Sequence, residues 1–239
     1  MLAEWGVPLA VAGMLAAALL VAGLMTRYQA YLALVRVAVH DLEAGLNRIA
    51  GALDTLRSVP LSRELRVALR AEVLARLHKV GSLHRRFPQL GERVVAARRA
   101  LESEGPTRSN GVGPIDNERQ LHQLIAAIDS LRVLLARETT LQPIPQDVRA
   151  IFRRELGDRR AETLARYHLV KARQLEAVGK VSAARTQLTT LLHQLRHQGA
   201  PTEFVRNFYI ETESALSALT ARQLEGLGAA LDGQSQRSA

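Results

Sequence analysis

The N-terminal uncharged run constrains the fold of this chain more than any other feature. From Trp5 to Thr26 the sequence reads WGVPLAVAGMLAAALLVAGLMT, without one charged side chain. About 20 apolar residues in a helix span the roughly 30 Å hydrocarbon core of a bilayer. Trp5 opens the run and Tyr28 and Tyr31 follow it, and amphipathic rings of this kind favour the headgroup region. We therefore expect residues 1–27 to form a transmembrane anchor with these three aromatic side chains at its interfaces.

Two other interpretations of this run are open. A cleaved signal peptide needs a basic start, but the start carries Glu4 without Lys or Arg, and the helical pattern continues past Gly23, the one plausible cleavage zone. A buried core helix is usually shorter than this run. Because Arg27 and Arg36 follow the run, the positive-inside rule places the N-terminus outside and residues 27–239 in the cytoplasm. We expect a single-pass protein of a bacterial inner membrane.

The overall composition predicts an all-α protein. Of the 239 residues, 47% are hydrophobic, mostly Ala, Leu and Val, and only 4% are aromatic. This balance favours helices over β-sandwiches and barrels, which use more Val, Ile, Tyr, Phe and Thr. The chain has no cysteine, which excludes disulfides, thiolate zinc sites and cysteine nucleophiles. The expected architecture is a single transmembrane helix, then a helical hairpin, then a C-terminal α-helical bundle.

Residues 28–102 are expected to form a membrane-proximal helical hairpin. A heptad seam of apolar residues, spaced alternately four and three apart, favours helix packing. Its flanking positions are small rather than charged, which favours a multi-helix bundle within one chain or between two. We expect further helices over about 62–86 and 89–102, and a homodimer through the transmembrane helix and residues 28–56 is left open. The seam residues are Tyr28, Leu32, Val35, Val39, Leu42, Leu46, Ile49, Leu53 and Leu56.

This hairpin also carries most of the excess positive charge. Residues 57–108 hold twelve Lys or Arg against five Asp or Glu, a net of +7 out of the chain's +9. One interpretation is a solvated helix face, and the other is contact with anionic lipid, to which each basic group contributes about 1 kcal/mol. Nucleic acid is a less favoured partner, because interleaved aromatic residues and known binding motifs are missing here. The candidate lipid contacts are Arg27, Arg85, Arg86, Arg93, Arg98 and Arg99.

A short segment of the first hairpin helix carries a recognisable motif. The segment His40 to Leu56, HDLEAGLNRIAGALDTL, resembles the phosphoacceptor box of sensor histidine kinases. His40, Asp41, Leu42, Leu46, Ile49 and Gly51 match the box, whereas Glu43 and Gly45 replace its usual Arg and Pro. The resemblance implies that His40 is an exposed phosphoacceptor. No nucleotide-binding domain accompanies the box, so it implies a phosphotransfer or pseudokinase module rather than an autokinase; an exposed structural histidine is the alternative.

The second half of the chain predicts a separate run of helices. Residues 103–117 are rich in Gly, Pro, Ser and Asn and predict a linker. Residues 118–231 then predict a helical domain, and residues 232–239 a disordered tail. Within this domain, Gly157 should stop a short helix and Asp158 should cap the next one.

One pair of predicted helices has a family resemblance. Residues 161–198 resemble a single tetratricopeptide hairpin, with Ala172, Gly179 and Ala184 on the small positions of that pattern and Leu188 on a large one. The resemblance implies two antiparallel helices, and it keeps a peptide-binding groove open without locating it. Since no 34-residue repeat follows, we expect a hairpin within a bundle rather than a solenoid.

Catalytic patterns are missing from the sequence. His193 and His197 have the i, i+4 spacing of two zinc ligands, but HQLRH lacks the glutamate of metalloproteases and Arg196 should oppose a cation. We expect no catalytic residues, metal or cofactor. The expected function is a membrane-anchored cytoplasmic scaffold or adaptor that binds a protein partner. The alternatives are a histidine-phosphotransfer or pseudokinase module using His40, and anionic lipid or nucleic-acid binding through the 57–108 arginines.

Overall fold

The computed structural model describes residues 6–84, 87–106, 111–137, 140–197 and 202–235, and the side chains of 6–13, 15–18 and 225–235 are not included in that description. These ranges contain helices and no strand, which confirms the all-α prediction. The elements are α1 (Gly6–Thr55), η1 (Leu56–Ser58), α2 (Arg63–Leu83), α3 (Leu90–Glu102), α4 (Glu118–Ala136), α5 (Gln146–Ala177), α6 (Val181–Arg196) and α7 (Glu203–Ser235).

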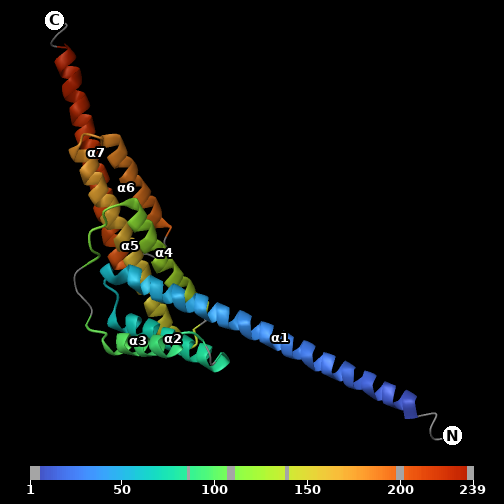
Figure 1. The fold of residues 1–239 in the computed structure, drawn as a ribbon. Coiled ribbons are helices and arrows are strands. Elements are labelled where there is room, and N and C mark those ends of the chain that lie inside the picture. The colour runs from blue at the N-terminus through green and yellow to red at the C-terminus, as the bar shows by residue number, and fades with distance from the viewer. Residues whose placement is uncertain (1–5, 85–86, 107–110, 138–139, 198–201, 236–239) are drawn as a thin grey trace.

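The predicted anchor and the first hairpin helix form one continuous helix, α1, of 50 residues. Figure 1 shows its N-terminal half extending away from the other helices, while its C-terminal end lies among α2 and α4. Of the helices in the described ranges, none has the length and hydropathy needed to cross a bilayer. The predicted transmembrane helix is therefore not supported there. Trp5 lies outside the described residues.

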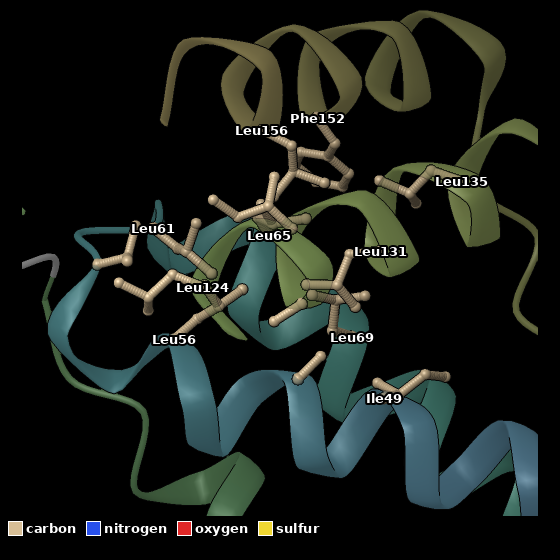
Figure 2. Close-up of a cluster of buried hydrophobic side chains, with 14 of the residues drawn as sticks. Ile49, Leu56, Leu61, Leu65, Leu69, Leu124, Leu131, Leu135, Phe152 and Leu156 are labelled. Carbon is tan, nitrogen blue, oxygen red and sulfur yellow. The ribbon is translucent and has the colours of Figure 1, made fainter. Parts of the chain in front are cut away.

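The C-terminal end of α1 is part of a core that four helices share. Ile49 and Leu56 pack with Leu65 and Leu69 of α2, with the apolar face of α4, and with Phe152 of α5 (Figure 2). Each fully buried side chain of this size contributes about 1.5–3 kcal/mol relative to exposure. Residues on both sides of the predicted linker thus share one core. That residues 103–117 separate two independently folding regions remains a prediction.

The heptad seam divides between core and solvent. Leu46, Ile49 and Leu56 at its C-terminal end are buried, and Val39 and Leu42 are half-buried. Towards the N-terminus the seam loses its cover, and residues 19–31 are exposed at every position. The C-terminal half of the seam therefore packs against other helices of the chain. Its N-terminal half is left for other contacts.

A second core lies between α5, α6 and α7. Ala165, Ala184 and Leu191 are fully buried there, and Ala172 and Leu188 are nearly so. Gly179 has a φ of 76° at the turn between α5 and α6, in the left-handed region that glycine adopts without steric cost. The predicted helical hairpin is present over the described residues 161–197, and its first helix begins earlier than expected, at Gln146.

The predicted break at Gly157 is wrong, because α5 runs unbroken from Gln146 to Ala177. A glycine inside a helix costs about 1 kcal/mol relative to alanine, and the burial of Leu156 and Ala161 on either side outweighs this cost. Asp158 is not a helix cap. Its carboxylate instead accepts a hydrogen bond from the Thr202 hydroxyl at 2.6 Å, which links α5 to the start of α7.

The predicted linker is docked on the helices where the structure describes it. The Val112 amide donates to Glu162 at 3.1 Å, and the Gly113 amide donates to the Ser58 carbonyl at 3.3 Å. Val112 is itself buried in the first core. At the C-terminus, α7 continues to Ser235, into the segment predicted as a tail, and residues 236–239 lie outside the described ranges.

Candidate interaction surfaces

The N-terminal part of α1, from Met14 to Val37, presents apolar side chains to solvent. Tyr28 and Tyr31, two of the predicted interface anchors, are exposed. Leu34 and Val37 are exposed one and two turns further along, beyond the predicted anchor. The other large exposed side chains of this stretch are Met14, Leu19, Leu20, Val21, Leu24 and Met25. Monomeric soluble proteins rarely expose a contiguous apolar surface of this kind, so this surface is a candidate contact region.

His40 is exposed on α1, as its position off the heptad seam predicts. The glycine that replaces proline in the surrounding motif has a packing role: a methyl group at Gly45 would overlap the guanidinium of Arg76. Gly51, which matches the motif, has open space around it. The packing of α2 against α1 therefore explains the glycine at position 45.

Several of the hairpin arginines are paired inside the fold. Arg66 and Arg70 both contact the carboxylate of Glu104, whose side chain is 6% exposed, the Arg66 contact measuring 2.7 Å. Arg76 donates to Glu72 at 2.7 Å, a pair that is almost fully buried. Glu72 and Glu104 are already counted in the net charge of +7, so these pairs fix the positions of three arginines without lowering the net charge of the hairpin.

The predicted lipid contacts that the structure describes lie on two different helices, α1 and α3. Arg93 contacts Glu43 and Asn47 of α1 at 3.4 and 3.2 Å and lies over the Phe87 ring. The other described members, Arg27, Arg98 and Arg99, are exposed, on α1 and α3. Arg85 and Arg86 lie outside the described residues.

Glu72 was not singled out from the sequence, yet it connects α2 to the segment between α4 and α5. The carboxylate is 1% exposed and accepts hydrogen bonds from the Leu141 and Gln142 amides, both at 3.0 Å, as well as from Arg76. A buried carboxylate needs such partners, because its desolvation is otherwise costly. Its sequence signal is the position on the apolar face of α2, three residues after buried Leu69.

Glu162 plays the same part on α5. It is 2% exposed and, besides the Val112 amide, it pairs with Arg159 at 2.7 Å and with Arg166 at 3.0 Å. A side chain at Gly111 would overlap the ends of the Arg166 and Glu162 side chains, so the ion pair lies directly against this glycine. The segment preceding α4 is thereby fastened to the middle of α5.

A cleft of about 500 Å³ lies where this fastened segment passes α5. Its wall combines the exposed apolar side chain of Val170 with Tyr167 and with the cations Arg166 and Lys171. Burial, followed by the charge of Glu118, raises the pKa of Tyr167, so the phenol stays protonated. The linker side of the wall consists of Val112, Gly113, Pro114, Ile115 and Asp116.

His168 lies beside Tyr167 but points into the fold. It is 7% exposed, and its Nδ1 is 2.8 Å from the Gln187 side-chain oxygen. Burial lowers its pKa, against the opposing effect of hydrogen bonds with Gln187 and Gln194. The imidazole is therefore held neutral at pH 7.

Among the described residues, no group of three or more His, Cys, Asp or Glu side chains is placed to hold a metal ion. Comparison with protein-family models, with curated proteins and with solved structures finds no match to this chain.

Proposed function

We propose that this protein is a non-enzymatic scaffold, tethered to the cytoplasmic face of a membrane by the N-terminal half of α1, and that it presents its helical bundle to a protein partner. The observation that carries the proposal is the division of α1. Its N-terminal half extends from the bundle with exposed apolar side chains, and its C-terminal end is embedded in the first core (Figure 1).

The tether is supported by the exposed apolar surface of α1 together with the uncharged run Trp5–Thr26. A single unbroken helix holds the bundle at a more constant distance from the membrane than a flexible linker would. From Arg27 to buried Leu46 the helix covers 19 residues, or about 29 Å at 1.5 Å per residue. The bundle is thus held at a defined distance from the membrane surface.

This distance argues against a lipid clamp at Arg93. That side chain contacts Glu43, which lies 16 residues after Arg27 and therefore about 24 Å further along the helix axis. Interactions between exposed charges are screened beyond about 8 Å at physiological ionic strength. With α1 upright, Arg93 stabilises the hairpin instead of contacting lipid.

The partner surface that we favour is the cleft between the linker segment and α5. Lys171 lines it as an exposed cation, together with Arg166, which is also paired with Glu162, and the carboxylate of Asp116. Val170 supplies an exposed apolar contact. This combination suits an extended peptide that carries an acidic group next to an apolar side chain, because complementary charge aids encounter and apolar burial supplies affinity.

Fractionation of cells that express the full chain tests the tether. We expect the chain in the membrane fraction after a carbonate wash, because an apolar helix is not released by pH or salt. The double substitution Leu15→Arg and Leu19→Arg, near the middle of the run Trp5–Thr26, should move it to the soluble fraction, since each charge at the centre of a span costs about 2.5–3.5 kcal/mol. Release of the unaltered chain by carbonate would contradict the tether.

Site-specific crosslinking in the same cells tests the partner surface. A photoreactive residue at position 174, on the cleft wall, should yield a defined crosslinked product with another protein. Lys171→Glu should abolish that product by reversing the charge of the cleft. The matched control is Lys180→Glu, which makes the same change just before α6. Loss of the product in both variants, or in neither, would count against the cleft.

A further inference from the structure

Two histidines at the end of α6 form a pair that the scaffold proposal does not use. His193 lies in the last turn of α6 and His197 is its C-terminal cap residue, and both are exposed. Their ring centroids are 4.3 Å apart, and the ring planes meet at 68°. Residues four apart on a helix lie on the same face, one turn above each other.

This spacing matches the geometry of two imidazoles on one metal ion. Imidazole nitrogens bind first-row metals at about 2.0–2.1 Å, which puts the metal roughly 3.2 Å from each ring centroid. Two rings in adjacent coordination positions then have centroids roughly 4.5 Å apart. The observed separation of 4.3 Å is close to that value, so the two rings are near enough to share one ion.

The guanidinium of Arg196, which lies between the two histidines in the sequence, is engaged by Tyr209 of α7. Its guanidinium donates to the Tyr209 hydroxyl, with Nε at 3.0 Å, and its Cζ lies 5.4 Å from the Tyr209 ring centroid, on α7. Because this guanidinium is bound to Tyr209, its repulsion of a cation at the histidines is weaker than the sequence alone suggests. The end of a helix also favours positive charge, because the last carbonyls carry partial negative charge.

The neighbouring cleft contains a carboxylate and two further arginines. Asp129 lines it together with the two histidines, and Arg132 and Arg160 both pair with Asp129, at 3.3 and 3.2 Å. The charge of these arginines is partly balanced by that carboxylate. Since no described group reaches three ligands, a closed structural zinc site is excluded for this region of the described fold.

We propose that His193 and His197 form a two-imidazole binding site for a late first-row divalent cation, with water in the remaining coordination positions. Imidazole ligands suit Cu²⁺, Ni²⁺ and Zn²⁺, and the general order of affinity places Cu²⁺ first. The site is independent of the membrane tether and of the linker cleft.

Titration of the full-length protein in detergent with CuCl₂ tests the site. We expect one ion per chain bound with an electron paramagnetic resonance spectrum showing two nitrogen ligands. His193→Ala and His197→Ala should each weaken binding by about tenfold or more, since even losing a group that only orients a ligand costs 10–100-fold. His40→Ala removes a lone exposed histidine and should leave the affinity unchanged.

A rebuilt pair distinguishes chelation from an indirect effect of the substitutions. Thr189 is exposed one turn before His193, so Thr189→His combined with His197→Ala restores an i, i+4 pair. This double variant should recover most of the Cu²⁺ affinity and the two-nitrogen spectrum. Full affinity in His193→Ala, or failure of the rebuilt pair to recover binding, would overturn the proposal.

Discussion

At the scale of single residues, buried carboxylates organise the arginine-rich surface of this protein. Glu72 accepts hydrogen bonds from two backbone amides and pairs with one arginine. Glu104 pairs with two arginines. Glu162 accepts a hydrogen bond from one backbone amide and pairs with two arginines. Charge-assisted hydrogen bonds of this kind are stronger than neutral ones. Arginines that look like a basic patch in the sequence therefore act, in part, as internal ties between helices and loops.

His168 gives the fold a pH-dependent contribution. Its pKa is lowered by burial, whereas an unfolded histidine titrates near 6.5. As the pH falls below that value, the unfolded chain binds a proton that the folded chain rejects, so the free energy of unfolding decreases. The decrease continues until the pH reaches the lower pKa of the folded state.

The substitution His168→Asn, which retains an amide donor toward Gln187, should therefore reduce this pH dependence. The measurement is urea unfolding of both proteins at pH 7.5 and pH 5.5. The difference in unfolding free energy between the two pH values should be smaller in the variant. An equal difference in both proteins would mean that other groups account for the acid sensitivity.

At the scale of elements, α1 is shaped by two glycines with opposite roles. Gly45 allows the buried Arg76–Glu72 pair to lie against the helix, whereas Gly51 faces open space. Only the surroundings distinguish them, because both lie within the same helix and the same motif. In the long helix α5, similarly, Gly157 does not end the helix, because buried residues lie on both sides of it.

We expect Gly51→Ala to raise the free energy of unfolding by about 0.5–1 kcal/mol, the usual gain in helix propensity. Gly45→Ala should instead lower it by about 1–3 kcal/mol, because the added methyl group displaces the buried Arg76 guanidinium. Chemical denaturation of the two variants in the same detergent gives the comparison. A similar gain at both positions would show that Arg76 moves aside without cost.

At the scale of the whole molecule, two cores are joined by two helices: α4 has Leu121 in the second core and Leu124 in the first, and α5 also contributes to both. Phe152 and Leu156 of α5 lie in the first core, and Leu164 and Leu169 of the same helix lie in the second. Because α5 is continuous between them, disrupting one core should be felt by the other. The chain is therefore expected to unfold as one unit, despite the linker that its composition suggests.

Leu65→Ala in the first core and Leu191→Ala in the second should each lower the unfolding free energy by about 2–5 kcal/mol. Both variants should retain one cooperative transition, followed by circular dichroism and by a fluorophore on the second core. Val133→Ala at an exposed position should change stability by less than about 0.5 kcal/mol. Two separate transitions, each shifted by only its own substitution, would establish independent domains divided at 103–117.

The sequence alone determined the all-α class, the approximate bounds of α2 and α3, and the exposure of His40, because these follow from local periodicity and propensity. The tertiary structure decided that α5 continues through Gly157, that Glu72 and Glu162 bind arginines and loop amides, and that Arg196 turns toward Tyr209. Each of these outcomes depends on burial against segments distant in sequence. Such burial outweighs a local preference of about 1 kcal/mol, and no local pattern encodes it.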